Sequence, residues 1–105
     1  MEEGNVWFHI LFCRLILLNK LLEDGNTLFK RNKMTDAAQR YQYAVKRVPQ
    51  VTGHHKPVFD QLRVHLLLNL ARCRRKMFDF QDAISLASQV LEIQPGSYQG
   101  LHARA

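Results

Sequence analysis

Residues 25–49 read GNTLFKRNKMTDAAQRYQYAVKRVP, and residues 71–95 read ARCRRKMFDFQDAISLASQVLEIQP. Both stretches end in proline, and both place small or bulky residues at the same distances before it. These positions are Gly25, Met34, Ala37, Tyr41 and Ala44 before Pro49, and Ala71, Phe80, Ala83, Ala87 and Val90 before Pro95. Small residues at helical spacing let two helices approach closely, and a proline ends the second helix. The sequence therefore predicts two helix–turn–helix units, offset by the 46 residues from Pro49 to Pro95.

The repeated pattern resembles the tetratricopeptide repeat, a helix–turn–helix unit of about 34 residues. This resemblance implies an all-α fold, a fragment of a right-handed α-solenoid. We expect an apolar leader helix at 1–17, a first repeat at 18–51, an inter-repeat loop and helix extension at 52–63, a second repeat at 64–97, and the truncated start of a third at 98–105. Since each repeat buries its face against the next, and an array normally needs about three, we expect the remaining repeats in a longer parent chain.

Within the two repeats we expect helices from about 18 to 31, from a cap at Thr35 or Asp36 to about 47, from about 59 to 77 and from about 80 to 93. Prolines bound the loop at 50–57, which contains His54 and His55. Two adjacent histidines are half of a metal site, and no acidic or thiol partner is near in sequence. We therefore expect a solvated loop, with no metal and no cofactor.

The leader is the least interpretable segment. Residues 6–22 read VWFHILFCRLILLNKLL, apolar at 13 of 17 positions but interrupted by His9 and Arg14. A secretory signal would have a basic start and a small-residue cleavage site, and a membrane span needs about 20 apolar residues. Three interpretations stay open: a helix that packs on the first repeat, a membrane contact, or the start of a splice variant or fragment.

The chain has 105 residues and a formal net charge of +6, which favours acidic partners. Two cysteines, far apart, define neither a disulfide framework nor a metal site, so we expect a reducing compartment. The sequence contains no phosphate-binding loop, no zinc-protease motif and no nucleophile elbow, so we expect no enzyme. Nucleic-acid binding is a weaker hypothesis because the positive charge is spread over several helices and no nucleic-acid fold signature is present.

Two finer resemblances can be seen. Residues 25–30 (GNTLFK) and 68–73 (LNLARC) resemble the repeats of co-chaperones and large immunophilins. Residues 37–44 (AAQRYQYA), 66–70 (LLLNL) and 72–76 (RCRRK), with Ser97-Tyr98 and 103–105, are closer to the repeats of TANC-type scaffolds, which combine ankyrin repeats, tetratricopeptide repeats and a coiled coil. The second resemblance implies a cytoplasmic scaffold at postsynaptic membranes.

Chaperone-binding members of the repeat family hold a C-terminal carboxylate with a clamp of asparagines and cations. The resemblance places the two clamp asparagines at Asn26 and Asn69. The three positions of the clamp cations hold Leu22, Gln99 and Ala103. Two carboxylates need several charge-assisted donors, so we do not expect a complete chaperone-tail clamp.

A different basic cluster lies on the helix expected at 59–77, where His65 shares the face. The candidate peptide-binding residues are Asn26, Lys30, Asn69, Arg72, Arg75 and Lys76, with Phe29 as an apolar contact. Arginine offers bidentate hydrogen bonds to the carboxylates of an acidic peptide, but basic residues at a helix end also suit the helix dipole without binding anything. We expect a non-enzymatic interaction module of a scaffold or adaptor that binds an acidic peptide, and the alternative is a co-chaperone or immunophilin-type adaptor.

Overall fold

The computed structural model describes residues 2–95, with side chains from Val6 onward. The expected start of a third repeat at 98–105 lies outside the described residues. Between residues 2 and 95 the chain forms helices and no strand. The elements are α1 (Glu2–Lys30), α2 (Met34–Val45), the short 3₁₀ helix η1 (Gly53–His55), α3 (Lys56–Lys76) and α4 (Phe80–Ile93).

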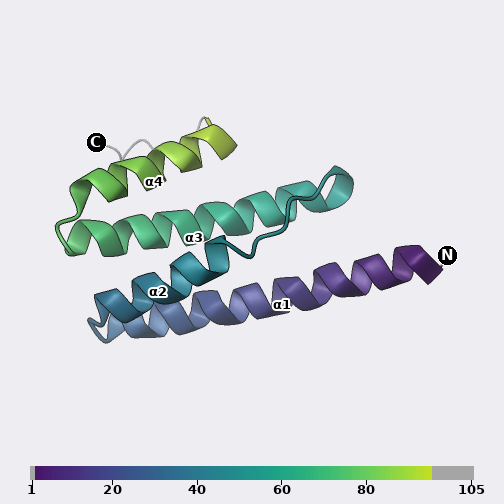
Figure 1. The fold of residues 1–105 in the computed structure, drawn as a ribbon, viewed down its shortest axis with the longest axis horizontal. Helices are drawn as coiled ribbons and strands as arrows, with labels where there is room; N and C mark the ends of the chain where they lie inside the picture. The colour runs from purple at the N-terminus through teal and green to yellow at the C-terminus, as the bar shows by residue number, and fades with distance from the viewer. Residues whose placement is uncertain (1, 96–105) are drawn as a thin grey trace.

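The four α-helices lie side by side in chain order, and each runs antiparallel to the one before it (Figure 1). Helix α2 packs between α1 and α3, and α3 packs between α2 and α4. The longer α3 buries nine residues, whereas α2 and α4 bury four each. The largest fully buried side chains are Tyr41, Leu18, Leu66, Leu67, Val90 and Cys73.

The structure confirms the all-α, tetratricopeptide-type repeat fold. The alanines predicted to allow close helix packing are no more than 5% exposed: Ala37, Ala44, Ala71, Ala83 and Ala87. Gly25 shows why the first repeat needs glycine, because a Cβ at this position would lie 2.8 Å from Cδ1 and Cζ of Tyr41. The close approach of helices α1 and α2 is therefore real.

The two interhelical turns repeat the same geometry 46 residues apart. Asn32 and Phe78 both adopt the left-handed conformation, with φ of 62° and 65°. The next N–H in each turn donates to a carbonyl five residues back, Lys33 to Leu28 at 2.9 Å and Asp79 to Arg74 at 2.8 Å. This six-to-one hydrogen bond is the Schellman arrangement that ends helices. Because the offset equals the one between Pro49 and Pro95, the turns support the duplicated unit.

Several helix ends differ from expectation. The α2 helix starts at Met34 with Lys33 as its N-cap and no side-chain cap, so the predicted cap at Thr35 or Asp36 is wrong. Helix α3 starts at Lys56, about three residues early, because Pro57 in its first turn has a φ that is already helical. Part of the expected loop, Gly53–His55, is a 3₁₀ turn.

The leader and the expected first helix of repeat one form a single continuous helix. No glycine or proline occurs between residues 5 and 24 to interrupt it, and Leu11 and Leu18 are buried along one side of it. Phe8 and Phe12 stack with ring centroids 6.3 Å apart, and with Phe59 of α3 they help to line a hollow of about 200 Å³. The leader thus packs toward α3 on one side. No helix in the described part of the chain is long and apolar enough to cross a membrane.

Candidate peptide-binding groove

Side chains from three helices meet in a small pocket near the ends of α1 and α3. Its volume is about 160 Å³. The lining residues are Asn26, Phe29 and Lys30 from α1, Tyr41 from α2, and Asn69 and Arg72 from α3. The pocket therefore brings together four of the six residues proposed from sequence as a peptide site, Asn26, Lys30, Asn69 and Arg72.

A chain of hydrogen bonds fixes the polar groups of the pocket. The hydroxyl of Tyr41 donates to Asn26 Oδ1 at 2.6 Å, and Asn69 Nδ2 donates to the same oxygen at 3.2 Å. Arg72 Nη1 donates to Asn69 Oδ1 at 3.3 Å. With the Asn26 oxygen shared by two donors, its Nδ2 hydrogens are the part of this amide available to a ligand. The two asparagines are thus preorganised as a pair.

Tyr41 remains a hydroxyl donor throughout the neutral range. Burial disfavours the charged phenolate, the nearby Cys73 acts in the same direction, and the Arg72 guanidinium opposes both; together they raise the pKa of Tyr41 to about 12. Only 1% of the Tyr41 side chain is exposed. The sequence assigned Tyr41 to packing alone, and its position opposite Gly25 was the signal that its hydroxyl would reach α1.

The cations stand at the rim of the pocket. Lys30 and Arg72 are exposed, and Lys76 Nζ lies 5.4 Å from the centroid of the Phe29 ring, within the range of a cation–π contact. Guanidinium and ammonium groups beside fixed amide donors can bind a carboxylate by charge-assisted hydrogen bonds. The arrangement is suited to an anionic ligand.

The basic run at residues 72–76 divides between different surfaces. At about 100° per residue, Asn69, Arg72 and Lys76 share one face of α3, and Arg75 projects away from it. Arg75 is exposed and does not line the pocket. Arg74 turns to the other side, where its Nε lies 2.9 Å from Asp82 Oδ2 of α4. Arg74 is therefore a link between helices, while the role of Arg75 in binding stays a prediction.

The position of the first clamp cation is apolar in the structure as well. Leu22 is half-buried and packs against the core. The other two clamp positions, Gln99 and Ala103, lie outside the described residues. Within residues 2–95 no group of three or more histidine, cysteine, aspartate or glutamate side chains is placed to hold a metal ion. His55 instead lies near Phe8, with ring centroids 6.3 Å apart.

The fold defines a helical-repeat module with a polar pocket on one face. No family model matches the chain. It is 32% identical over 89 residues to the peptidyl-prolyl cis-trans isomerase PASTICCINO1 of Arabidopsis thaliana, a match that covers 82% of this chain and 14% of the relative. It is also 31% identical over 88 residues to DnaJ homolog subfamily C member 3 of Bos taurus, covering 84% of this chain and 16% of the relative.

Both relatives contain tetratricopeptide repeats, which supports a tetratricopeptide-like family for this chain. The matched regions are interaction modules, and the isomerase activity in the first name belongs to another domain of that protein. The chain spans less than a fifth of the length of either relative. The comparisons therefore support a protein-interaction repeat module, with relatives of the co-chaperone and immunophilin-like classes. They do not show the TANC-type subfamily.

Proposed function

We propose that this chain is the peptide-binding module of a co-chaperone or immunophilin-type adaptor and has no catalytic activity of its own. The observation that carries the proposal is the pocket where Asn26 and Asn69 are held in one hydrogen-bonded pair beside Lys30 and Arg72. The two tetratricopeptide-containing relatives favour this class of adaptor. The partner is a protein with an exposed acidic segment.

The binding mode follows from the groups at the pocket. A side-chain carboxylate of the peptide accepts hydrogen bonds from Asn26 Nδ2 and the Arg72 guanidinium, and Lys30 lies at the rim. The peptide then continues along α3 toward Lys76 and the ring of Phe29. Because Leu22 occupies the first clamp-cation position, the ligand is an internal acidic segment and not a carboxyl terminus.

A second candidate is a TANC-type scaffold in the cytoplasm, at postsynaptic membranes. It rests on the sequence runs that resemble this subfamily, and the apolar Leu22 in place of a clamp cation favours it over a chaperone-binding adaptor. The two candidates share the same groove and differ in the peptide that it binds.

Fluorescence polarisation with an acidic, C-terminally amidated peptide tests the groove. Arg72→Glu should weaken binding at least about tenfold, and adding Lys30→Glu should weaken it further, since hydrogen bonds to charged groups contribute about 1.5–3 kcal/mol each. Arg75→Glu is a single charge reversal on the same helix outside the pocket, and it tests the binding role that the sequence predicts for Arg75. The pocket predicts a change of less than about threefold for this variant, because exposed charges attract each other weakly in solvent.

Equal losses in Arg75→Glu and Arg72→Glu would mean general charge attraction and would contradict the groove. An oligonucleotide of the same charge that binds as tightly as the peptide would also contradict the groove. The free-acid form of the peptide tests the binding mode: no gain over the amide is expected for an internal acidic segment, and a large gain would indicate a terminal clamp and contradict the proposed mode. Far-UV circular dichroism of every variant verifies that the helices remain intact.

A further inference from the structure

The N-terminal half of α1 leaves an unusual amount of apolar surface uncovered. Seven large apolar side chains are about half exposed there: Val6, Trp7, Phe8, Ile10, Phe12, Ile16 and Leu17. Together they leave on the order of 600 Å² uncovered, distributed around the helix. Figure 1 shows this half of α1 extending beyond the end of α2. Exposed apolar surface of this kind indicates an interaction site.

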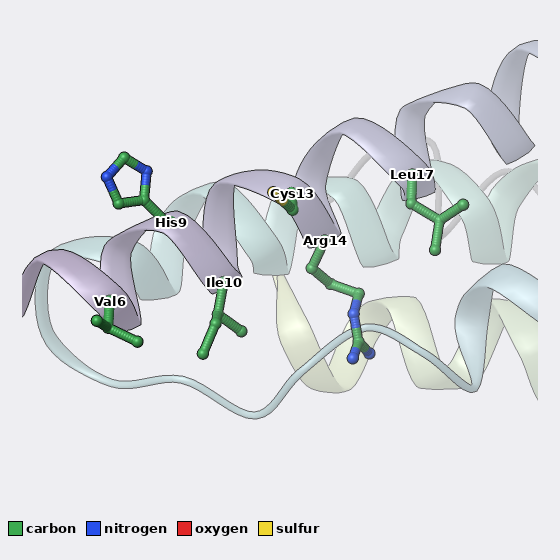
Figure 2. A pocket seen from close by; sticks show the side chains of 6 residues that line it. All are labelled: Val6, His9, Ile10, Cys13, Arg14 and Leu17. Atoms are coloured by element: carbon green, nitrogen blue, oxygen red, sulfur yellow. The ribbon is translucent and has the colours of Figure 1, made fainter. Parts of the chain in front are cut away.

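One line of these residues has the spacing of a helix–helix interface. Val6, Ile10, Cys13 and Leu17 are separated by four, three and four residues, the a/d spacing of a coiled coil. With His9 and Arg14 they line a shallow groove of about 510 Å³ (Figure 2). Arg14 is held at its edge, where Nη1 donates to the carbonyl oxygen of Arg47 at 3.1 Å. We call Val6, Ile10, Cys13 and Leu17 the α1 seam.

The α1 seam ends sharply. The next two positions in the same spacing are Lys20 and Asp24, whose Nζ and Oδ1 atoms form an ion pair of 3.4 Å in solvent. Lys20 and Asp24 correspond, 46 residues on, to Leu66 and Leu70, which are buried in α3. Another repeat packed along the whole of α1 would have to bury this ion pair, with a desolvation cost of several kcal/mol. The occupant therefore covers the N-terminal half alone.

We propose that a second copy of this chain occupies the α1 seam, in an antiparallel pairing about a two-fold axis between Ile10 and Cys13. Val6 then meets Leu17 of the second copy, and Ile10 meets its Cys13. Such an interface is self-complementary, as a two-fold dimer requires. Covering the α1 seam and the flanking Trp7 and Ile16 on both copies would bury on the order of 1,000 Å², the range of a weak, reversible complex.

The charges favour the antiparallel direction. Each chain carries a formal charge of +6, and this pairing places the two helical bodies at opposite ends of the contact. A parallel pairing would bring Lys20 against its own copy at the position after Leu17. The peptide groove stays open in the dimer because its α1 residues, Asn26 to Lys30, lie beyond the ion pair. This dimer contact is separate from the proposed peptide binding, and two copies would present two grooves.

Sedimentation equilibrium of the full chain tests the dimer, between about 1 µM and 1 mM. The mass should approach twice the 12.3 kDa of one chain. Ile10→Glu should make the chain monomeric, while the matched control Ile84→Glu should leave the dimer intact. Ile10 and Ile84 are 49% and 46% exposed, but Ile84 lies on α4, away from the α1 seam. A monomeric parent chain, or equal loss in both variants, would overturn the proposal.

Disulfide trapping tests the direction of the pairing. In an equimolar mixture of the parent chain and an Ile10→Cys, Cys13→Ala variant, diamide should oxidise the introduced thiol and Cys13 of a parent copy to a disulfide, giving a covalent heterodimer. The two thiols then lie on different chains, so no disulfide can form within one helix. The parent chain, with Cys13 alone on this surface, should stay non-covalent, because Cys73 is buried. A covalent dimer of the parent would indicate a parallel pairing and overturn the antiparallel one. Binding of a monomeric chain to vesicles of phosphatidylserine and phosphatidylcholine would assign the surface to membranes instead.

Discussion

Gly25→Ala should destabilise the protein, although the same change stabilises most helices. The new Cβ would lie 2.8 Å from Cδ1 and Cζ of Tyr41 and closer still to Cε1. The Tyr41 ring is 1% exposed and its hydroxyl is fixed to Asn26, so a move of the ring toward the neighbouring pocket would break that hydrogen bond. Relief of the overlap therefore requires a shift of α1 against α2 or loss of the tyrosine hydrogen bond.

The magnitude follows from opposing effects. Alanine in place of glycine gains about 1 kcal/mol of helix propensity. Overpacking costs about 1–3 kcal/mol, and losing the Tyr41 to Asn26 hydrogen bond costs about another 0.5–1.5 kcal/mol. We expect a net loss of about 1–3 kcal/mol in the free energy of unfolding, measured by urea denaturation followed with far-UV circular dichroism.

A double-mutant cycle with Tyr41→Ala isolates the cause. Tyr41→Ala alone destabilises because it leaves a cavity, but it also removes the ring that blocks the new Cβ. In that background Gly25→Ala should stabilise by about 1 kcal/mol, which corresponds to a coupling of about 2–4 kcal/mol between the two sites. A Gly25→Ala effect of the same sign and size in both backgrounds would refute the steric explanation.

Three further predictions follow from the fold. Burial raises the pKa of Tyr41 to about 12 and that of Cys73 to about 11, so both groups stabilise the fold in their neutral forms. The free energy of unfolding should keep its full value below about pH 9 and fall by up to about 1.4 kcal/mol per pH unit per group as the pH approaches 12. Cys73→Ala should reduce this slope in urea denaturation measured at several pH values. Asp79→Ala should lower the free energy of unfolding by about 1 kcal/mol because its carboxylate caps α4, whereas Thr35→Ala, at a position with no cap hydrogen bond, should change it by less than about 0.5 kcal/mol. Phe78→Gly should raise the midpoint of thermal unfolding, because a left-handed φ of 65° suits glycine and Phe78 is 80% exposed. An unchanged or lower midpoint would count against this turn geometry.

The paired helices were predictable because spacing alone encodes them. Gly25 and the alanines of α2 and α4 recur where helices must approach closely, and α4 begins and ends at Phe80 and Ile93 as expected. The start of α2 was not predictable from the sequence, because Thr35 and Asp36 are both good capping residues by type. The chain turned at Asn32 instead, and its left-handed φ placed the first helical residue at Met34.

The candidate groove was predictable in part. The resemblance placed Asn26 and Asn69 at the two clamp-asparagine positions, but a hydrogen bond between residues 43 positions apart depends on how α1 and α3 are packed. The three arginines in RCRRK looked like one cluster, although helical rotation places Arg74 about 200° from Arg72, and Arg75 does not line the pocket. That Arg74 contacts Asp82 required knowing that α4 returns along α3.

The most direct test of the groove is heteronuclear NMR of the labelled chain during titration with the amidated acidic peptide. The side-chain amide signals of Asn26 and Asn69 are well suited because both groups are fixed in the pocket. Binding at the pocket should shift these two signals most, together with the backbone amides of Lys30 and Arg72. Saturating peptide that shifts only signals of α4 or of the N-terminal half of α1, and leaves both asparagine side chains unchanged, would contradict it.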